Sequence, residues 1–147
     1  KWRYVLPIED DLLVPPDAVI RLCESIEEGP FDGVSGMYWT KSEDLPMPMA
    51  YGSPEEFART GVLDFRPRDV TDALKSGGIM PVNGIACGCS LYRMSLFKDL
   101  PFPWFVTSPS TTQDLAMCGV ARRAGKTFAV DCRVRCGHLD FETGRVY

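Results

Sequence analysis

Three acidic residues in a row, Glu9, Asp10 and Asp11, follow the apolar run Val5 to Ile8. Adjacent carboxylates repel one another, and a fold that gathers them at the end of a strand usually offsets this cost with a cation. In open α/β sheets, ligands bind in the crevice beyond the carboxyl ends of the strands. Asp11 is therefore the best candidate for a metal ligand. The alternative is a solvated turn before a helix, because a helix N-terminus favours acids.

The only histidine of the chain, His138, follows the apolar run Phe128 to Arg135, which predicts a final strand. A lone histidine is more often a surface residue or a satisfied core residue than a ligand. This one, however, is delivered at the carboxyl end of a strand. We expect Asp11 and His138 to share one cleft at the ends of neighbouring strands. A carboxylate together with an imidazole suits Mn²⁺, and Mg²⁺ would also bind the carboxylate.

Asp114 is the candidate general base, because transfer to a hydroxyl group requires a positioned acceptor for the hydroxyl proton. The segment Thr111 to Ala124 predicts a helix, with Thr111 as its N-cap. Asp114 would then be the third helical residue, where an acid can simply complete a capping box. The two roles can coexist, and the sequence favours neither the general base nor the helix cap.

Aromatic and glycine residues supply further candidates for binding. Gly88 lies in a glycine-rich corner, where the backbone can approach a bound sugar closely. Trp104 and Phe105 lie in a proline-rich loop and could stack on a sugar ring. They are equally well explained as ordinary hydrophobic anchors.

The six cysteines allow a sharper alternative, a zinc site. Cys87, Cys89, Cys132 and Cys136, together with His138, offer soft ligands. Neither half has the C-x2-C spacing typical of structural zinc, so free, buried thiols are the preferred interpretation.

Length and composition bound the class of protein. The chain has 147 residues, of which 45% are hydrophobic and 24% charged, and this is typical of one globular domain, 1–147. A net charge of −4 gives no footprint for nucleic acid. No apolar stretch approaches the roughly 20 residues that span a bilayer. The chain has no initiator Met and opens inside the expected strand Trp2 to Ile8, so we expect a piece of a longer protein.

Alternating elements predict an α/β fold with a mixed sheet flanked by helices. The expected strands are Trp2 to Ile8, buried on both faces, Val34 to Thr40, Ile79 to Val82, Ala86 to Tyr92 and Thr127 to Arg135. The expected helices run from Pro15 to the stop at Gly29-Pro30, from Ser53 to Ala58, from Met94 to Leu100 and from Thr111 to Ala124. Lys41 to Gly52 and Pro103 to Ser110 are expected to be loops, and Gly61 to Gly78 gives only a weak signal.

Several motifs in this order resemble the second half of a GT-A glycosyltransferase domain, nearest to family 2. Glu9 to Asp11 is similar to the D-x-D motif of that family and leads into Val14-Pro15-Pro16-Asp17. The other matching segments are Gly88 to Arg93, Phe97, Pro103 to Phe105, Gln113-Asp114, Ala124 to Lys126 and Cys136 to His138. The resemblance covers essentially the whole chain.

The resemblance implies a metal-dependent enzyme that moves a sugar from a nucleotide-diphosphate sugar to a glycan, lipid or protein acceptor. It implies that Asp11 and His138 hold Mn²⁺ or Mg²⁺ and that Asp114 is the base of an inverting transfer. It places Glu9, Asp10 and Gly88 at the nucleotide-sugar. Trp104, Phe105 and Gln113 would face the acceptor.

Three departures from the family pattern accompany the resemblance. Glu9 stands where the family has Asp, Gln113 replaces an acid beside the expected base, and the first, nucleotide-binding βαβ units are missing. We therefore expect a fragment that can be inactive alone, from a cytoplasmic protein that is membrane-associated at full length.

Two rival functions remain open. The chief rival is a non-catalytic GT-A-like module that binds a glycan or a protein, which Gln113 and the missing nucleotide half favour. A glycoside hydrolase is the second, and it predicts two carboxylates that face each other across a sugar cleft without a metal.

Overall fold

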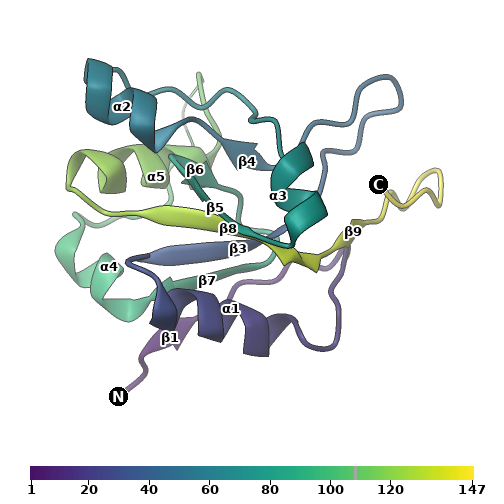
Figure 1. Cartoon of the computed structure of the whole chain (residues 1–147), viewed down its shortest axis with the longest axis horizontal. Coiled ribbons are helices and arrows are strands. Elements are labelled where there is room, and N and C mark those ends of the chain that lie inside the picture. Colours follow the sequence, from purple (N-terminus) through teal and green to yellow (C-terminus); the bar gives the residue numbers. More distant parts are fainter. Residues whose placement is uncertain (108) are drawn as a thin grey trace.

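A five-stranded mixed sheet forms the centre of the computed structural model, which describes residues 1–107 and 109–147 (Figure 1). The sheet has the strand order β1-β7-β3-β8-β5. Its strands are β1 (Tyr4–Val5), β3 (Gly33–Met37), β5 (Ile79–Val82), β7 (Ser90–Arg93) and β8 (Phe128–Arg135). β3 and β8 are parallel, and the other neighbours are antiparallel. The expected α/β class with a mixed sheet is confirmed.

Two short ribbons accompany the sheet. One pairs β2 (Leu12–Leu13) with β9 (Gly137–His138), and the other pairs β4 (Ala50–Tyr51) with β6 (Gly84–Ile85). Both pairs are antiparallel and two residues long. A strand of two residues is too short to show an alternation of apolar and polar residues, so neither ribbon could be predicted from the sequence.

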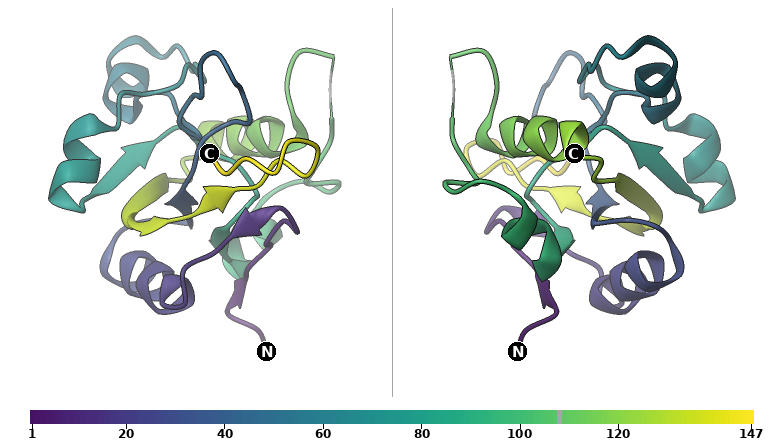
Figure 2. Two further views of the ribbon diagram at one scale, coloured as in Figure 1. Left: turned by 90° about the vertical axis from the view of Figure 1, so that its right-hand side faces the viewer. Right: turned by 90° about the vertical axis from the view of Figure 1, so that its left-hand side faces the viewer.

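Helices cover both faces of the sheet, which makes three layers (Figures 1 and 2). The helices are α1 (Ala18–Glu28), α2 (Pro54–Thr60), α3 (Thr71–Ser76), α4 (Met94–Asp99) and α5 (Gln113–Arg123). Alternating residues of β8 pack against the helices on opposite faces of the sheet. Phe128, Val130 and Cys132 belong to the core cluster that includes α5, whereas Ala129, which lies between the first two, belongs to the cluster that includes α1. This alternation follows from the period of two along a strand.

Helix α1 follows Pro15 and Pro16 and ends before Gly29, as expected. Its buried face consists of Ala18, Leu22, Ser25 and Ile26. Val19 has the spacing of this face but lies outside it, because 48% of Val19 is exposed.

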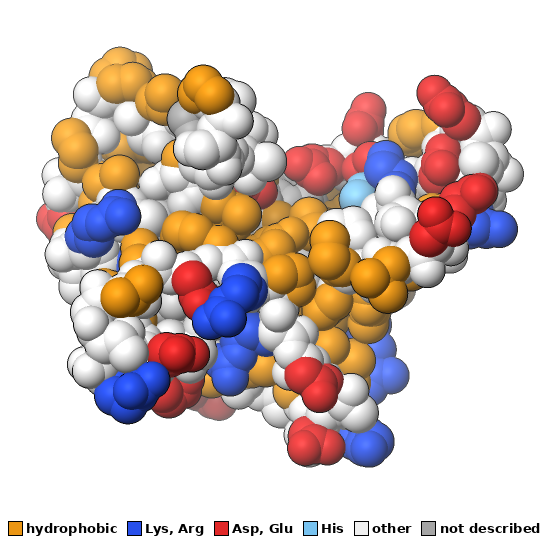
Figure 3. All heavy atoms as spheres, turned by 90° about the horizontal axis from the view of Figure 1, so that it is seen from above, with side chains coloured by type: hydrophobic (Ala, Val, Ile, Leu, Met, Phe, Trp, Pro, Cys, Tyr) orange, Lys and Arg blue, Asp and Glu red, His pale blue; other side chains and the backbone are white. Residues whose placement is uncertain are grey.

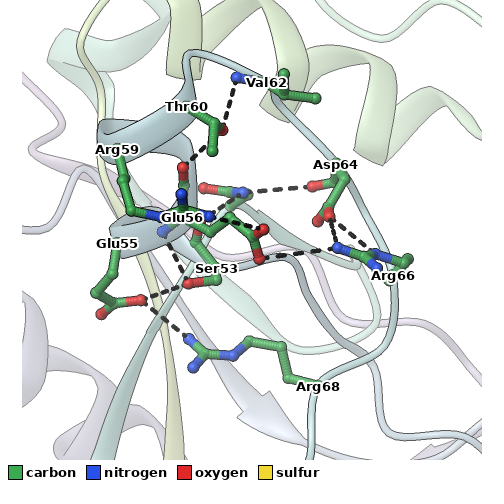
Figure 4. A network of polar contacts seen from close by, with 10 residues as sticks. Ser53, Glu55, Glu56, Arg59, Thr60, Val62, Asp64, Arg66 and Arg68 are labelled. Carbon is green, nitrogen blue, oxygen red and sulfur yellow. Dashed lines mark hydrogen bonds and ion pairs between the residues drawn. The ribbon is translucent and has the colours of Figure 1, made fainter.

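Helix α2 begins as the capping pattern predicts. The Ser53 hydroxyl accepts a hydrogen bond from the Glu56 backbone N–H at 3.1 Å. Around this cap, Figure 4 shows a surface network in which Glu55 pairs with Arg68 and Glu56 pairs with Arg66. These ion pairs are exposed and contribute little to stability individually.

The expectation of a strand buried on both faces over Trp2 to Ile8 is wrong. Only Tyr4 and Val5 form a strand, and β1 lies at the edge of the sheet, bonded to β7 alone among the described strands. Ile8 makes one isolated bridge to Cys89 and is 49% exposed, while Trp2 is 88% exposed. Pro7 lacks an N–H and prevents a continuous ladder through this run.

The weak stretch from Gly61 to Gly78 contains the short helix α3. The expected loop from Pro103 to Ser110 is free of regular structure where it is described, and its residue 108 lies outside the described residues. In the described part of the chain, none of the helices is both long and apolar enough to cross a membrane.

Candidate functional site

The ribbon of β2 and β9 brings the two expected metal ligands together. Leu12 pairs with His138, and the Leu139 backbone N–H donates to the carbonyl oxygen of Asp11 at 2.8 Å. The side chains of Asp11 and His138 meet, with Nε2 of His138 lying 3.4 Å from Oδ2 of Asp11. The two side chains share one site, as expected. The reason differs from the expected one, because a ribbon joins them and not the carboxyl ends of neighbouring sheet strands.

A backbone carbonyl fixes the proton on the imidazole of His138. Nδ1 lies 2.7 Å from the carbonyl oxygen of Trp39, which can only accept a hydrogen bond. Nδ1 therefore carries a proton, and in the neutral form of the ring Nε2 presents a lone pair toward Asp11. Metal-binding histidines are typically oriented in this way, with the second ring nitrogen donating to a carbonyl or a carboxylate.

The Asp11 carboxylate is only partly satisfied by the protein. Oδ2 accepts a hydrogen bond from the Lys41 ammonium at 2.6 Å, and this bond holds the pKa of Asp11 below its usual value. Oδ1 is buried and has no hydrogen-bond partner among the described residues. A buried carboxylate oxygen without a partner is costly, so an additional cation or proton would stabilise this arrangement.

The distance between these two side chains is compatible with two ligands of one divalent cation. Two ligands about 2.0–2.1 Å from an octahedral ion lie about 3 Å apart, close to the 3.4 Å between Asp11 and His138. Over residues 1–107 and 109–147, no group of three or more His, Cys, Asp or Glu side chains is placed to hold a metal. Mg²⁺ is commonly held by one or two carboxylates plus the phosphates of a substrate, so two protein ligands are compatible with such a site.

Glu9 and Asp10 form the entrance to the turn that carries Asp11. The Glu9 backbone N–H donates to the Gly88 carbonyl at 2.9 Å, and both acidic side chains are exposed. Packing around the Glu9 carboxyl, and then the charges of Asp11 and Asp114, raise the pKa of Glu9. Three of the candidate residues therefore interact electrostatically across one site.

Gly88 allows close packing of two neighbouring side chains. A Cβ at this position would lie 2.4 Å from the Tyr38 hydroxyl and 2.7 Å from a methyl group of Leu12. The glycine makes room for a protein side chain and is itself buried, and its expected contact with a nucleotide-sugar stays a prediction. The Gly88 backbone N–H donates to the Tyr38 hydroxyl at 2.9 Å, and the Tyr38 ring meets the His138 ring edge-on at 5.5 Å. Gly88 thus supports the site through Tyr38.

Asp114 lies at the start of α5, one position earlier than expected. The N-cap is Thr112 and not Thr111, which makes Asp114 the second helical residue. Its Oδ1 accepts from the Leu115 backbone N–H at 2.8 Å and from the Thr112 hydroxyl. Asp114 therefore stabilises the helix start. Its charge also raises the pKa of Glu9, Tyr38 and Cys87, so the carboxylate lies within electrostatic reach of the site.

The three expected acceptor residues line one apolar pocket of about 390 Å³. Trp104, Phe105 and Gln113 contribute to its wall, together with Cys87, whose pKa is raised to about 11 by burial. Trp104 also packs against Phe97, with 5.0 Å between ring centroids. The aromatic side chains are thus both hydrophobic anchors and the wall of a cavity.

The cysteines are free and scattered through the core. Cys89, Cys118, Cys132 and Cys136 are buried, and Cys23 and Cys87 are half-buried. The thiols of Cys89 and Cys136 hydrogen-bond to each other. This distribution agrees with the interpretation as buried thiols.

Sequence reasoning missed Lys41, Trp39 and Tyr38, which all contact the candidate ligands. They stand at the end of the expected strand Val34 to Thr40 and directly after it. The rule that ligands gather beyond the carboxyl ends of strands was applied to acids alone, and it would also have selected Lys41.

Seen from above the sheet, acidic side chains gather around the pale blue histidine at the rim of a hollow (Figure 3). The hollow separates the body of the molecule from the arm that carries the C-terminus. The site therefore opens to solvent between these two parts.

The fold has a counterpart among solved structures. No protein-family model and no curated protein sequence matches this chain. The crystal structure of A197 from STIV is similar, with a TM-score of 0.67 and 12% sequence identity. The match covers 99% of this chain and 65% of A197, so this chain spans about two thirds of the A197 chain. At this identity the likeness shows a shared fold alone.

Proposed function

We propose that this chain belongs to a metal-dependent glycosyltransferase of GT-A-like fold, which moves a sugar from a nucleotide-sugar to an acceptor hydroxyl with inversion. One observation carries the proposal. Nε2 of His138 and Oδ1 of Asp11, which has no partner among the described residues, belong to one site, and Trp39 accepts the proton of Nδ1. This donor set suits Mn²⁺ or Mg²⁺.

In this proposal each residue around Asp11 and His138 has its own role. Asp11 and His138 would hold the cation, which would neutralise the negative charge that develops on the leaving diphosphate. Glu9 and Asp10 border the same turn and would contact the ribose and the diphosphate. Asp114 would accept the acceptor's proton as that oxygen bonds to the anomeric carbon and the bond to the diphosphate oxygen breaks.

The apolar pocket beside α5 supplies the acceptor side of the proposal. Trp104 and Phe105 present aromatic surface there, and Gln113 stands next to Asp114 at its wall. Small-molecule sites are mostly apolar with a few placed polar groups, and this pocket has that character. We infer that it receives the apolar face of a sugar or an apolar group attached to the acceptor.

A non-catalytic binding module is the second candidate, and one observation favours it. The Lys41 ammonium already neutralises Asp11, as a lysine would in a relic site that has lost its metal. The two candidates differ in one measurable property, because only the enzyme requires Asp11 and His138 to bind a cation.

Mn²⁺ binding tests the proposal directly. Electron paramagnetic resonance of free Mn²⁺ should show binding to the native chain, and Asp11→Asn and His138→Ala should each abolish it. Nucleoside diphosphate should then be released from one member of a panel of nucleotide-sugars, in a reaction that EDTA stops. Release of free sugar from a glycoside in the presence of EDTA would instead indicate a hydrolase. If the native chain and a Lys41→Met variant both fail to bind Mn²⁺, with and without pyrophosphate, the enzyme proposal is wrong.

A further inference from the structure

Lys41 and the proposed cation compete for the same carboxylate. Nζ of Lys41 lies 2.6 Å from Oδ2 of Asp11, the oxygen that also faces His138. Both side chains are largely covered, with 33% of Lys41 and 18% of Asp11 exposed. An ammonium group and a divalent cation repel each other, so the two compete for the place next to this oxygen.

The backbone around Lys41 is held while the side chain can move. The Trp39 carbonyl accepts from His138, and the Thr40 N–H donates to the Met47 carbonyl at 2.9 Å. Lys41 itself carries its charge on a flexible stem with three rotatable donors. The ammonium can therefore leave Asp11 through side-chain rotation, without disturbing the carbonyl that orients His138.

The negative charge of the site favours a second positive group beside a bound diphosphate. Glu9, Asp11 and Asp114 interact electrostatically, and together they oppose the approach of a diphosphate. A divalent cation alone offsets only part of this negative charge. A second positive group that bonds to phosphate oxygens would offset more, and Lys41 is the cation already paired within the site.

We propose that Lys41 is an internal counter-ion that the metal displaces from Asp11 and that then bonds to a phosphate oxygen of the substrate. This inference rests on the proposed function. Each partner prepares the site for the other, because the metal frees the ammonium and the diphosphate gives it a new partner. Metal and diphosphate should therefore bind cooperatively, and each should increase the affinity for the other by the same factor.

Lys41→Met tests this exchange, with Mn²⁺ and pyrophosphate as the probes. Mn²⁺ alone should bind Lys41→Met about 2- to 10-fold more tightly than the native chain, because a partly exposed ion pair no longer competes. The complex of Mn²⁺ with pyrophosphate should bind this variant more weakly, measured by calorimetry with Mn²⁺ in excess. Lys41→Arg should restore the binding of the complex.

Lys75→Met is the matched control, because Lys75 lies on α3 and is 74% exposed. It removes the same charge and should change neither affinity. Thermal melting of each variant checks that the fold is kept.

The outcomes separate this inference from the proposed function. If native chain and Lys41→Met bind Mn²⁺ equally, the exchange is wrong and the metal site stands. If neither binds Mn²⁺, the proposed function is wrong and the exchange falls with it. If only Lys41→Met binds Mn²⁺, the metal does not displace Lys41 in the native chain, and both the exchange and the metal-dependent function are wrong.

Discussion

The position of one proton determines what the candidate site can hold. Nδ1 of His138 donates to Trp39, so in the neutral form of the ring Nε2 faces Asp11 as an acceptor at 3.4 Å. Two acceptors that face each other are unfavourable unless a cation or a second proton lies between them. The unpartnered Oδ1 of Asp11 adds to this demand. At the residue scale, the site is therefore incomplete without a further positive group.

Asp114→Asn separates catalysis from helix capping. An amide oxygen can still accept from the Leu115 N–H and the Thr112 hydroxyl, so α5 should keep its start. The amide cannot accept the acceptor's proton, and transfer should fall about 10²- to 10⁴-fold. Mn²⁺ affinity should stay within about 2-fold, since Asp114 is not among the proposed ligands. Asp11→Asn should instead weaken both Mn²⁺ binding and transfer. Native transfer rates in Asp114→Asn would leave this residue as a helix cap alone.

Glu9→Gln should make stability respond to pH in a defined direction. The folded state raises the pKa of Glu9 above its usual value of 4.5, through burial and the charges of Asp11 and Asp114, with His138 and Lys41 opposing. Glu9 therefore favours the fold at low pH and loses this contribution as pH rises through its raised pKa. The neutral variant should melt higher than the native chain at pH 7 and equally at pH 3.

Asp11→Asn provides the opposite sign for the same measurement. The pKa of Asp11 is lowered in the fold, so its contribution to stability is present above its usual value of 3.8 and disappears as pH falls. Asp11→Asn should melt lower than the native chain at pH 7, and this difference should shrink in acid. Melting curves in which both variants shift alike would contradict the two pKa directions.

At the scale of elements, long periodic segments could be predicted and very short ones could not. The position of α1 could be predicted from its apolar spacing and the prolines before it, and the position of β8 from its long apolar run. The ribbon of β2 and β9 carries both candidate ligands but has two residues in each strand, too few for any period. Asp11 and His138 could therefore be chosen by residue type, whereas their contact depends on tertiary pairing that the sequence does not display.

Gly88→Ala tests whether the turn before β7 supports the site through Tyr38. The new methyl group would lie 2.4 Å from the Tyr38 hydroxyl, so the tyrosine or the corner must move. Overpacking of this kind should lower the free energy of unfolding by about 1–3 kcal/mol, measured by urea denaturation. Tyr38 packs against His138, so Mn²⁺ affinity should fall as well.

Gly119→Ala is the control for this substitution. Gly119 lies within α5, and the nearest atom to an added Cβ is 3.5 Å away, an ordinary contact. Alanine in a helix should therefore stabilise the chain by about 0.4–1 kcal/mol. Equal effects at Gly88 and Gly119 would show that the contact with Tyr38 does not matter.

For the molecule as a whole, the two edges of the sheet are protected unequally. On β5, Pro81 removes one donor from the edge, and the Arg68 guanidinium donates to the Pro81 carbonyl at 2.8 Å. On β1, Val5 is 40% exposed and Trp2 is 88% exposed beside it. Natural sheets protect their edges with prolines and charged side chains. The two residues of β1, Tyr4 and Val5, are neither. The β1 edge is therefore the one that favours association with another chain.

Val5→Lys should reduce self-association of the 147-residue chain. The native chain should elute from a sizing column at increasing apparent mass as its concentration rises, because apolar strand edges recruit other chains. A lysine at position 5 places a charge on this edge and should keep the variant monomeric at concentrations where the native chain associates. Ile79→Lys places the same charge on β5, where Pro81 and Arg68 already protect the edge, and it should leave association unchanged. A native chain that stays monomeric at high concentration, or an equal effect of both lysines, would show that β1 does not mediate the contact.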